Sequence, residues 1–224
     1  MVNVDKRSDK LLLNAKVVFW DFDGVIKESV EVKAQAYLDL FTEFGSEIVD
    51  CVRDRHAKDG GASRYKRIPL LFEKCAGISL NEAEIADKCE LYASIVMQNV
   101  IDCSFIPGAE TYLAENSNRQ TFVLTTNTPK TEIDVILDRL SLRSHFSEVY
   151  GAPIEKCTVV EEWLKTNMIP PEECIFIGDS PIDQNAAKAN GVPFILRRTS
   201  ENVDMSIDAA DMEIKDFTAF SNST

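Results

Sequence analysis

Residues that form zinc sites are scarce in this sequence. Its 224 residues include only two histidines, His56 and His145, and six cysteines without a single CxxC pair. Structural zinc sites use closely spaced cysteine and histidine ligands, so the sequence argues against a zinc protein. We expect the six cysteines to be reduced and mostly packed: Cys51, Cys75, Cys89, Cys103, Cys157 and Cys174.

Positive charge is also scarce. The chain has 24 lysines and arginines against 37 aspartates and glutamates, which gives a formal net charge of −13. Nucleic acids and anionic membranes bind proteins through clustered Lys and Arg side chains, so neither is an expected partner. A site for an anionic small molecule would therefore need a few local cations, metal ions and backbone donors.

Long apolar runs are missing as well. The run Leu11–Leu13 is too short for a signal peptide, and no stretch approaches the ~20 apolar residues of a membrane span. We therefore expect a cytoplasmic protein. The content of 45% hydrophobic and 27% charged residues is typical of a folded globular chain, and the length predicts one main core with an appended piece.

Short apolar runs recur along the chain, and most are followed by acidic or small polar residues. The runs are Lys16–Trp20, Thr121–Leu124, Cys174–Ile177 and Pro193–Leu196. Helical patterns alternate with them, one opening at Thr128-Pro129 and another running from Ser180-Pro181 to Gly191. This alternation predicts an α/β fold, a doubly wound Rossmann-like parallel sheet. Ligands of such sheets bind beyond the carboxyl ends of the strands.

A segment is inserted between the first two predicted strands. Asp21 and Thr126 are about 100 residues apart, whereas one crossover needs only ~30 residues. The intervening segment has helical patterns, and Ser79 with Glu82 predicts a capping box at the start of one helix. We therefore predict a helical cap at residues 28–103 and a Rossmann-like catalytic core at residues 1–27 and 104–224. After Arg198 we expect a short strand or helix at the sheet edge.

Polar residues cluster where the predicted strands end. Asp21 and Asp23 follow the first run, and two carboxylates this close raise each other's cost of ionisation unless a cation lies between them. Aspartate can attack phosphorus when a divalent cation, a hydroxyl group and an ammonium group hold the phosphate oxygens. Residues that could bind a cation or supply a hydroxyl, amide or ammonium group follow the later predicted strands. They are Thr126, Asn127, Lys156, Asp179 and Asp183.

These residues resemble the four motifs of the haloacid dehalogenase superfamily. The motifs read DFDGV from Asp21, LTTN ending at Asn127, EKC around Lys156, and GDSPID ending at Asp183. The segments FIPGAE and AAKANGVPF are also similar to the family, so the resemblance covers nearly the whole chain. The position of the insert is similar to the helical-capped phosphatase subgroup, which includes enzymes like phosphoglycolate phosphatase and β-phosphoglucomutase.

The resemblance implies a phosphatase in which Asp21 attacks phosphorus and forms an aspartyl phosphate. Asp23 would protonate the leaving oxygen and then deprotonate the attacking water. Mg²⁺ would be bound by the Asp21 carboxylate, the Asp23 carbonyl and Asp179. The other implied roles are phosphate binding by Thr126 and the Asn127 amide, neutralisation of phosphate by Lys156, and support from Gly24 and Asp183.

Each of these residues also has a purely structural interpretation. DFDG could be an ordinary loop, and Asp183 could merely close a capping box with Ser180. Lys156 could be a solvated helix residue. Thr125 is the alternative to Thr126, because adjacent strand residues point in opposite directions; the family pattern of Thr followed by Asn favours Thr126.

The predicted cap contains DGGASRYKR, in which two glycines precede Arg64, Lys66 and Arg67. In one interpretation these residues form a solvated basic face. In the other, residues 60–67 form a loop over the site, and Arg64 and Lys66 recognise the leaving group of the substrate. A basic cluster in an acidic chain favours an anionic or polyhydroxyl substrate, which we expect to be a small phosphorylated metabolite such as a sugar phosphate.

Several other functions share these features. Asp23 argues against a dehalogenase or a phosphonate-cleaving enzyme of the same superfamily, whereas a sugar phosphomutase shares both the motifs and the cap. A signalling receiver also has an acidic pair, a Thr and a Lys, but is much shorter. A binding protein descended from the enzyme is a third alternative. Steady, magnesium-dependent release of phosphate would distinguish an enzyme from the receiver and the binding protein.

Overall fold

The structure, a computed structural model, describes residues 11–58, 63–208 and 211–220. The chain divides into two compact units, which we call unit 1 and unit 2. Unit 1 comprises Met1–Glu28 and Ser104–Thr224, and unit 2 comprises Ser29–Cys103. The site motifs predicted from the sequence lie in unit 1, and the basic segment lies in unit 2.

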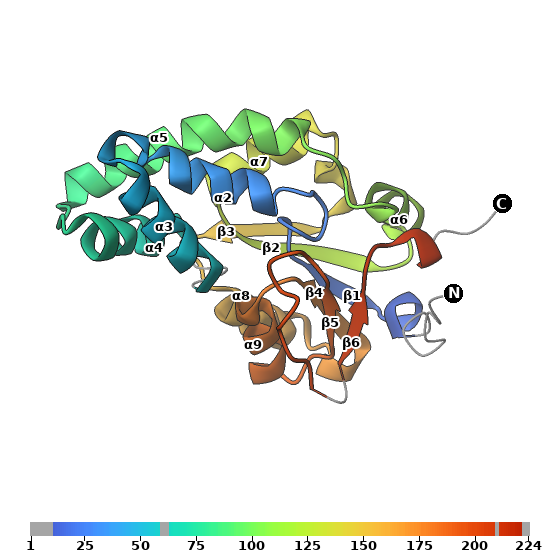
Figure 1. The fold of residues 1–224 in the computed structure, drawn as a ribbon. Helices are drawn as coiled ribbons and strands as arrows, with labels where there is room; N and C mark the ends of the chain where they lie inside the picture. The colour runs from blue at the N-terminus through green and yellow to red at the C-terminus, as the bar shows by residue number, and fades with distance from the viewer. Residues whose placement is uncertain (1–10, 59–62, 209–210, 221–224) are drawn as a thin grey trace. The chain divides into compact units, whose positions relative to one another are not determined.

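Unit 1 contains a six-stranded parallel sheet with the strand order β3-β2-β1-β4-β5-β6 (Figure 1). The strands are β1 Val17–Trp20, β2 Thr121–Pro129, β3 Glu148–Ala152, β4 Cys174–Gly178, β5 Phe194–Arg197 and β6 Met212–Ile214. β1 pairs with β2 and β4, and all four of its residues are buried, which is typical of a central parallel strand. The predicted α/β fold class is confirmed.

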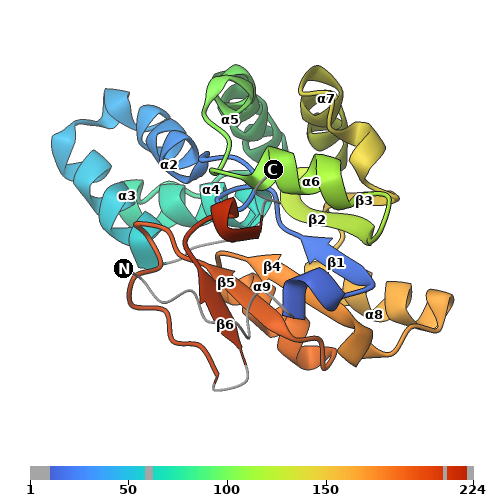
Figure 2. The ribbon, with the colours of Figure 1, turned by 90° about the vertical axis from the view of Figure 1, so that its right-hand side faces the viewer.

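Helices cover both faces of this sheet (Figure 2). They are α6 Ala109–Asn116 and α7 Lys130–Arg139 on one face, and α8 Lys156–Asn167 and α9 Pro181–Ala189 on the other. Successive side chains of β1 reach opposite faces: Phe19 contacts Trp163 of α8, and Trp20 contacts Tyr112 of α6. Unit 1 also contains short 3₁₀ helices: Arg143–His145, Pro171–Glu173 and Thr218–Phe220.

The apolar runs predicted four of the six strands, namely β1, β2, β4 and β5. β3 was not predicted, and β6 is the short edge element expected after Arg198. The start of α7 was predicted wrongly at Thr128-Pro129. The helix begins at Lys130, because β2 continues through Pro129, which pairs with Ala152 of β3.

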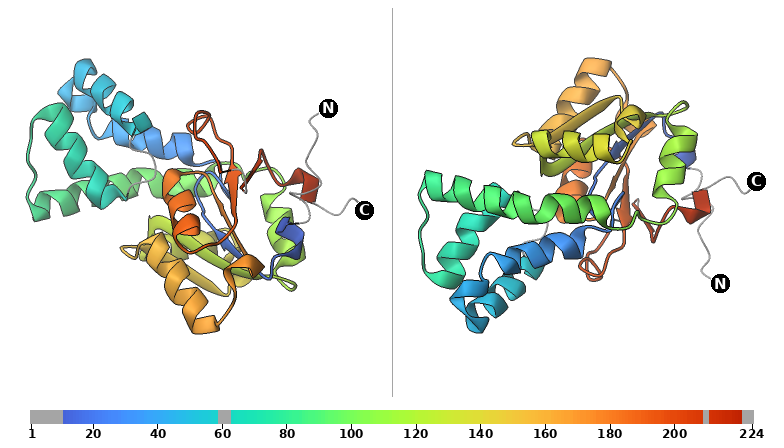
Figure 3. Two further views of the ribbon diagram at one scale, coloured as in Figure 1. Left: turned by 90° about the horizontal axis from the view of Figure 1, so that it is seen from below. Right: turned by 90° about the horizontal axis from the view of Figure 1, so that it is seen from above.

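Unit 2 is helical. Its helices are α2 Val30–Asp39, α3 Ser46–Lys58, α4 Arg64–Leu71 and α5 Glu82–Asp102, with a 3₁₀ helix at Thr42–Phe44 and a π-helix at Phe72–Ala76. α2 packs along α5 (Figure 3), where the rings of Tyr37 and Tyr92 lie 4.4 Å apart between centroids. Among the described residues, no helix combines the length and the apolar character needed to cross a bilayer.

The capping box that starts α5 is formed by Asn81 and Glu84, so the prediction of Ser79 and Glu82 was wrong. The Glu84 N–H donates to Asn81 Oδ1 at 3.0 Å, and the Asn81 N–H donates to Glu84 Oε2 at 2.8 Å. The pattern was therefore right in kind but two residues too early. Asn81 directly precedes the first helical residue, and Asn caps a helix as well as Ser does.

The cysteine prediction was wrong for one pair. Cys51 of α3 and Cys75 form a disulfide, because the packing of α3 on the π-helical segment brings their Cα atoms to 5.7 Å. The other cysteines remain thiols: Cys89 and Cys174 are buried, and Cys103 and Cys157 are partly buried.

The chain leaves and re-enters unit 1 through two adjacent segments that hydrogen-bond to each other. The Glu28 N–H donates to the Ser104 carbonyl, and the Ile106 N–H donates to the Ile26 carbonyl, each at 2.9 Å. Arg197, at the end of β5, donates to both carboxylate oxygens of Glu28, at 3.1 and 2.8 Å. This bidentate ion pair between Arg197 and Glu28 stabilises the junction against the end of β5.

Gly108, just before α6, allows a test of the packing in unit 1. Its φ is 79°, and an added Cβ would lie 2.6 Å from the Phe217 carbonyl carbon. At Gly191 φ is 67° but the nearest atom is 3.9 Å away, so alanine there adds backbone strain alone. We expect Gly191→Ala to cost about 1–2 kcal/mol in the free energy of unfolding, and Gly108→Ala at least ~1 kcal/mol more. Equal losses in urea unfolding would contradict this account.

Candidate active site

Asp21 is the first residue after β1, at the carboxyl edge of the sheet. Its N–H donates to the Ile177 carbonyl of β4 at 2.9 Å, which continues the strand pairing. The Phe22 N–H donates to Asp21 Oδ1 at 2.7 Å. The strand pairing therefore fixes the backbone of Asp21, and the Phe22 N–H binds its buried carboxylate.

Lys156, the first residue of α8, lies between two carboxylates. Its Nζ is 2.8 Å from Asp21 Oδ1 and 2.6 Å from Asp183 Oδ1, and only 2% of the residue is exposed. The alternative that Lys156 is a solvated helix residue is therefore wrong. Burial lowers the pKa of Lys156, but the two carboxylates outweigh that effect and hold the pKa above its ordinary value.

Asp183 forms a capping box and also contacts Lys156. Its Oδ2 accepts hydrogen bonds from the Ser180 N–H at 3.1 Å and the Ser180 hydroxyl at 2.6 Å, which forms the capping box of α9. Its Oδ1 accepts from Lys156. Gly178 makes room for this side chain, because an added Cβ there would lie 2.2 Å from Asp183 Cβ.

Three carboxylates converge at this edge of the sheet. Asp21, Asp179 and Asp183 each offer an oxygen atom, and these atoms lie within 4.8 Å of one another. Burial, together with the carboxylates of Asp183 and Asp23, raises the pKa of Asp21 to about 7 against the opposing effect of Lys156. Burial and the charges of Asp21 and Asp183 raise the pKa of Asp179 well above its usual value. Lys156 alone does not balance this negative charge.

The donor set fits a hard divalent cation. Carboxylate oxygens are the ligands that Mg²⁺ and Ca²⁺ prefer, and a cation among them would offset the burial and the mutual repulsion that raise the pKa values of Asp21 and Asp179. Both oxygens of Asp183 already accept hydrogen bonds from Lys156 and Ser180. Asp21 and Asp179 are therefore the better candidates for ligands.

The Thr-Asn motif lies in a bulge of β2. Thr125 pairs with Tyr150 and Pro129 with Ala152, so three residues of β2, 126–128, stand opposite the single residue Gly151 of β3. Bulges re-aim side chains and are common beside active sites. Both Thr125 and Thr126 are buried, and Thr126 Oγ accepts a hydrogen bond from the Thr128 N–H at 3.2 Å.

Asp23 lies in the turn that follows Asp21 and is partly buried. The next residue, Gly24, has a φ of 71°, and its N–H donates to the Lys27 carbonyl at 2.8 Å. This left-handed conformation explains the glycine of the DFDG motif. The Asp23 carboxylate accepts a hydrogen bond from the hydroxyl of Thr128, a residue that we did not predict.

Asn202 was also missed, and it supports the loop that carries Asp179. Its side-chain amide donates to the Asp179 carbonyl at 2.7 Å and to the Arg197 carbonyl at 2.8 Å. Its Oδ1 accepts from the Thr199 N–H at 2.9 Å. A single buried amide thus ties the segment after β5 to the loop after β4, and no sequence pattern signals such a contact.

Both interpretations of the basic segment in unit 2 were partly wrong: two of its three basic residues are buried rather than solvated, and residues 64–67 belong to a helix rather than to a loop. Arg64 is the first residue of α4, is buried, and places its guanidinium 4.7 Å from the centre of the Tyr92 ring. Arg67 is also buried, over Tyr37 at 5.1 Å, whereas Lys66 is exposed. The two glycines that precede this segment lie outside the described residues.

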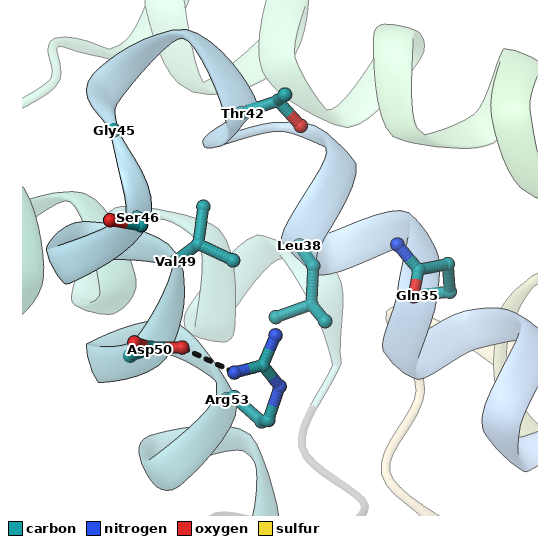
Figure 4. Close-up of a pocket in the computed structure, with 8 residues that line it drawn as sticks. All are labelled: Gln35, Leu38, Thr42, Gly45, Ser46, Val49, Asp50 and Arg53. Atoms are coloured by element: carbon teal, nitrogen blue, oxygen red, sulfur yellow. Dashed lines mark hydrogen bonds and ion pairs between the residues drawn. The ribbon is translucent and has the colours of Figure 1, made fainter.

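A separate pocket lies within unit 2, between α2 and α3 (Figure 4). It has a volume of about 370 Å³, and an ion pair between Arg53 and Asp50 lies along it. The described lining residues are Gln35, Leu38, Thr42, Gly45, Ser46, Val49, Asp50 and Arg53. No predicted site residue is among them.

Residues 18–197 match the model of the haloacid dehalogenase-like hydrolases. The chain belongs to this family. It is 26% identical over 188 residues to a phosphoglycolate phosphatase of Pseudomonas savastanoi pv. phaseolicola, a match that covers 79% of this chain and 67% of the relative. The same values hold for the phosphoglycolate phosphatase of Pseudomonas fluorescens. The predicted superfamily and the predicted enzyme class, a phosphatase, are confirmed.

Solved structures of this family share the fold. CbbY from Rhodobacter sphaeroides, in complex with phosphate, superposes with a TM-score of 0.73 at 17% identity, over 91% of this chain and 95% of that one. β-Phosphoglucomutase from Clostridium difficile superposes with a TM-score of 0.69 at 18% identity, over 90% of this chain and 91% of that one. At these identities the likeness concerns the fold.

The buried position of Lys156 predicts a large effect on stability. Lys156→Met should lower the free energy of unfolding by about 3–5 kcal/mol, because it leaves two buried carboxylates without their cation. Lys165→Met is the matched control: it lies on the same helix and pairs with Glu161, but its side chain is 72% exposed. We expect the control to cost less than about 1 kcal/mol. Similar losses for both variants in chemical denaturation would contradict the assignment.

Proposed function

We propose that this chain is a magnesium-dependent phosphatase that hydrolyses a small phosphorylated metabolite through an aspartyl phosphate on Asp21. The main support is the position of Lys156 between Asp21 and Asp183 at the carboxyl edge of the sheet. An ammonium group held there can neutralise phosphate oxygens beside the attacking carboxylate. The carboxylates around it would provide the oxygen ligands of the proposed metal site.

In the proposed reaction, an Asp21 carboxylate oxygen bonds to phosphorus while the bond from phosphorus to the leaving oxygen breaks. Asp23 gives its proton to that oxygen, which departs as an alcohol. Water then bonds to phosphorus, its proton passes to Asp23, and the bond between Asp21 and phosphorus breaks. Phosphate is released and both carboxyl groups return to their starting states.

The remaining site residues bind and orient in this proposal. Lys156 neutralises phosphoryl oxygens, the Thr126 hydroxyl and the Asn127 amide donate to them, and Asp183 fixes Lys156. The Asp21 and Asp179 carboxylates and the Asp23 carbonyl would hold Mg²⁺. When bound, this ion would stabilise the negative charge of the phosphoryl group and allow Asp21 to be anionic at neutral pH.

The proposed substrate is a small phosphate ester, with a sugar phosphate as our candidate. Both curated relatives are phosphoglycolate phosphatases, and a variant of CbbY has been solved with xylulose-(1,5)bisphosphate. In unit 2, Arg64 and Lys66 remain our candidates for substrate specificity. A panel of phosphorylated metabolites, assayed for phosphate release, would identify the substrate. Isomerisation of a sugar phosphate without net phosphate release would instead indicate a phosphomutase.

Asp21→Asn tests the nucleophile. The amide is a poor nucleophile, so phosphate release should fall below about one hundredth of the wild-type rate. Lys156 keeps its ion pair with Asp183 in this variant, so the fold should persist. Asp138→Asn, an exposed change on α7, serves as the control and should leave the rate unchanged. Substantial activity in Asp21→Asn would exclude a covalent intermediate on this residue.

Metal binding can be tested without any turnover. Mg²⁺ at ~100 times its dissociation constant should raise the melting temperature of the wild type by roughly 5–10 °C. Asp179→Asn removes one carboxylate, so its shift should be much smaller. KCl at matched ionic strength controls for screening and should shift neither protein. Equal Mg²⁺ shifts in wild type and variant would show that Asp179 is not a ligand.

A further inference from the structure

Thr128 is the third residue of the bulge in β2, and it is 97% buried, with a relative exposure of 3%. Its hydroxyl donates a hydrogen bond to Asp23 Oδ2 at 3.1 Å. The contact joins residues 105 positions apart in the sequence, from the loop after β1 to the end of β2. It is a side-chain hydrogen bond to the carboxyl group to which we assign proton transfer.

The bulge places this hydroxyl. Thr126 and Thr128 are two residues apart, and the Thr128 N–H donates to Thr126 Oγ at 3.2 Å. The two threonines are thus linked to each other, and the second is linked to Asp23. A general acid must hold its proton within hydrogen-bond reach of the leaving oxygen, so the rotation of the Asp23 carboxyl group matters as much as its position.

We propose that Thr128 is a positioning residue for Asp23. Its hydroxyl binds Oδ2, so that Oδ1 is the oxygen that gives the proton to the leaving group and later receives one from water. This inference rests on the proposed function, because it assigns a task to the acid that the proposed reaction requires. Thr128 itself touches neither the phosphorus nor the attacking oxygen in this proposal.

The test compares kcat/KM for phosphate esters with different leaving groups, from p-nitrophenyl phosphate to simple alkyl phosphates. This parameter covers the steps up to departure of the leaving group and is insensitive to the later attack of water. Aryl leaving groups need little protonation, whereas alkyl ones need the acid. Thr128→Val keeps the shape of the side chain and removes the hydroxyl, and Thr128→Ser keeps the hydroxyl.

We expect Thr128→Val to lower kcat/KM roughly tenfold for alkyl phosphates and less than about twofold for p-nitrophenyl phosphate. Thr128→Ser should stay within about threefold of wild type for both. Ser147→Ala is the matched control, because it removes another hydroxyl that donates to β2, at the Phe122 carbonyl. Ser147→Ala should leave kcat/KM unchanged for alkyl phosphates and for p-nitrophenyl phosphate. If valine unfolds the strand, Thr128→Ala gives the same comparison.

Asp23→Asn separates the acid role of Asp23 from the positioning role of Thr128. It should lower kcat/KM steeply for alkyl and least for aryl phosphates, and adding Thr128→Val to it should change little further. A uniform loss in Asp23→Asn would refute the acid itself, and with it the proposed function of Asp23. The positioning role alone would be overturned by a different pair of results. In that case Asp23→Asn lowers kcat/KM more for alkyl than for aryl phosphates, whereas Thr128→Val lowers it equally for both or not at all.

Discussion

Lys156 lies almost completely buried between the carboxylates of Asp21 and Asp183, and the three groups come from three different elements. Lys156 is the first residue of α8, where the helix dipole attracts anions and therefore disfavours an ammonium group. It is stable there because both carboxylates accept hydrogen bonds from it. The carboxyl end of β1 and the first turns of α8 and α9 are therefore held together by charge as well as by apolar contacts between the helices and the sheet.

The same cluster carries more negative than positive charge. Asp179 adds a third carboxylate, and the pKa values of Asp21 and Asp179 are both raised, mainly by burial. Without a cation, the burial and mutual repulsion of these carboxylates therefore destabilise the folded chain relative to the unfolded one. Proteins commonly accept such a cost at functional sites. Here the cost is confined to strand ends and leaves the buried apolar faces of the sheet intact.

Much of this arrangement could be predicted from local sequence. Apolar runs revealed four strands, and the motif residues Asp21, Lys156, Asp179 and Asp183 are brought together. β3 was missed because its five residues, EVYGA, include a glutamate and a glycine and give no continuous apolar run. Thr128, Asn202 and the Cys51–Cys75 disulfide depend on contacts between distant segments, which composition and periodicity do not encode.

Gly151 of β3 faces the bulge that carries the two threonines, and an added Cβ would lie 2.6 Å from both the Thr128 carbonyl oxygen and the Lys130 nitrogen. A residue without a side chain thus allows the backbone of β2 to lie this close to β3. Any larger residue there would collide with the backbone of the bulge at Thr128 and Lys130. In evolution or in design, a substitution at Gly151 would therefore reshape this edge of the sheet from a neighbouring strand, with every side chain of the proposed site left unchanged.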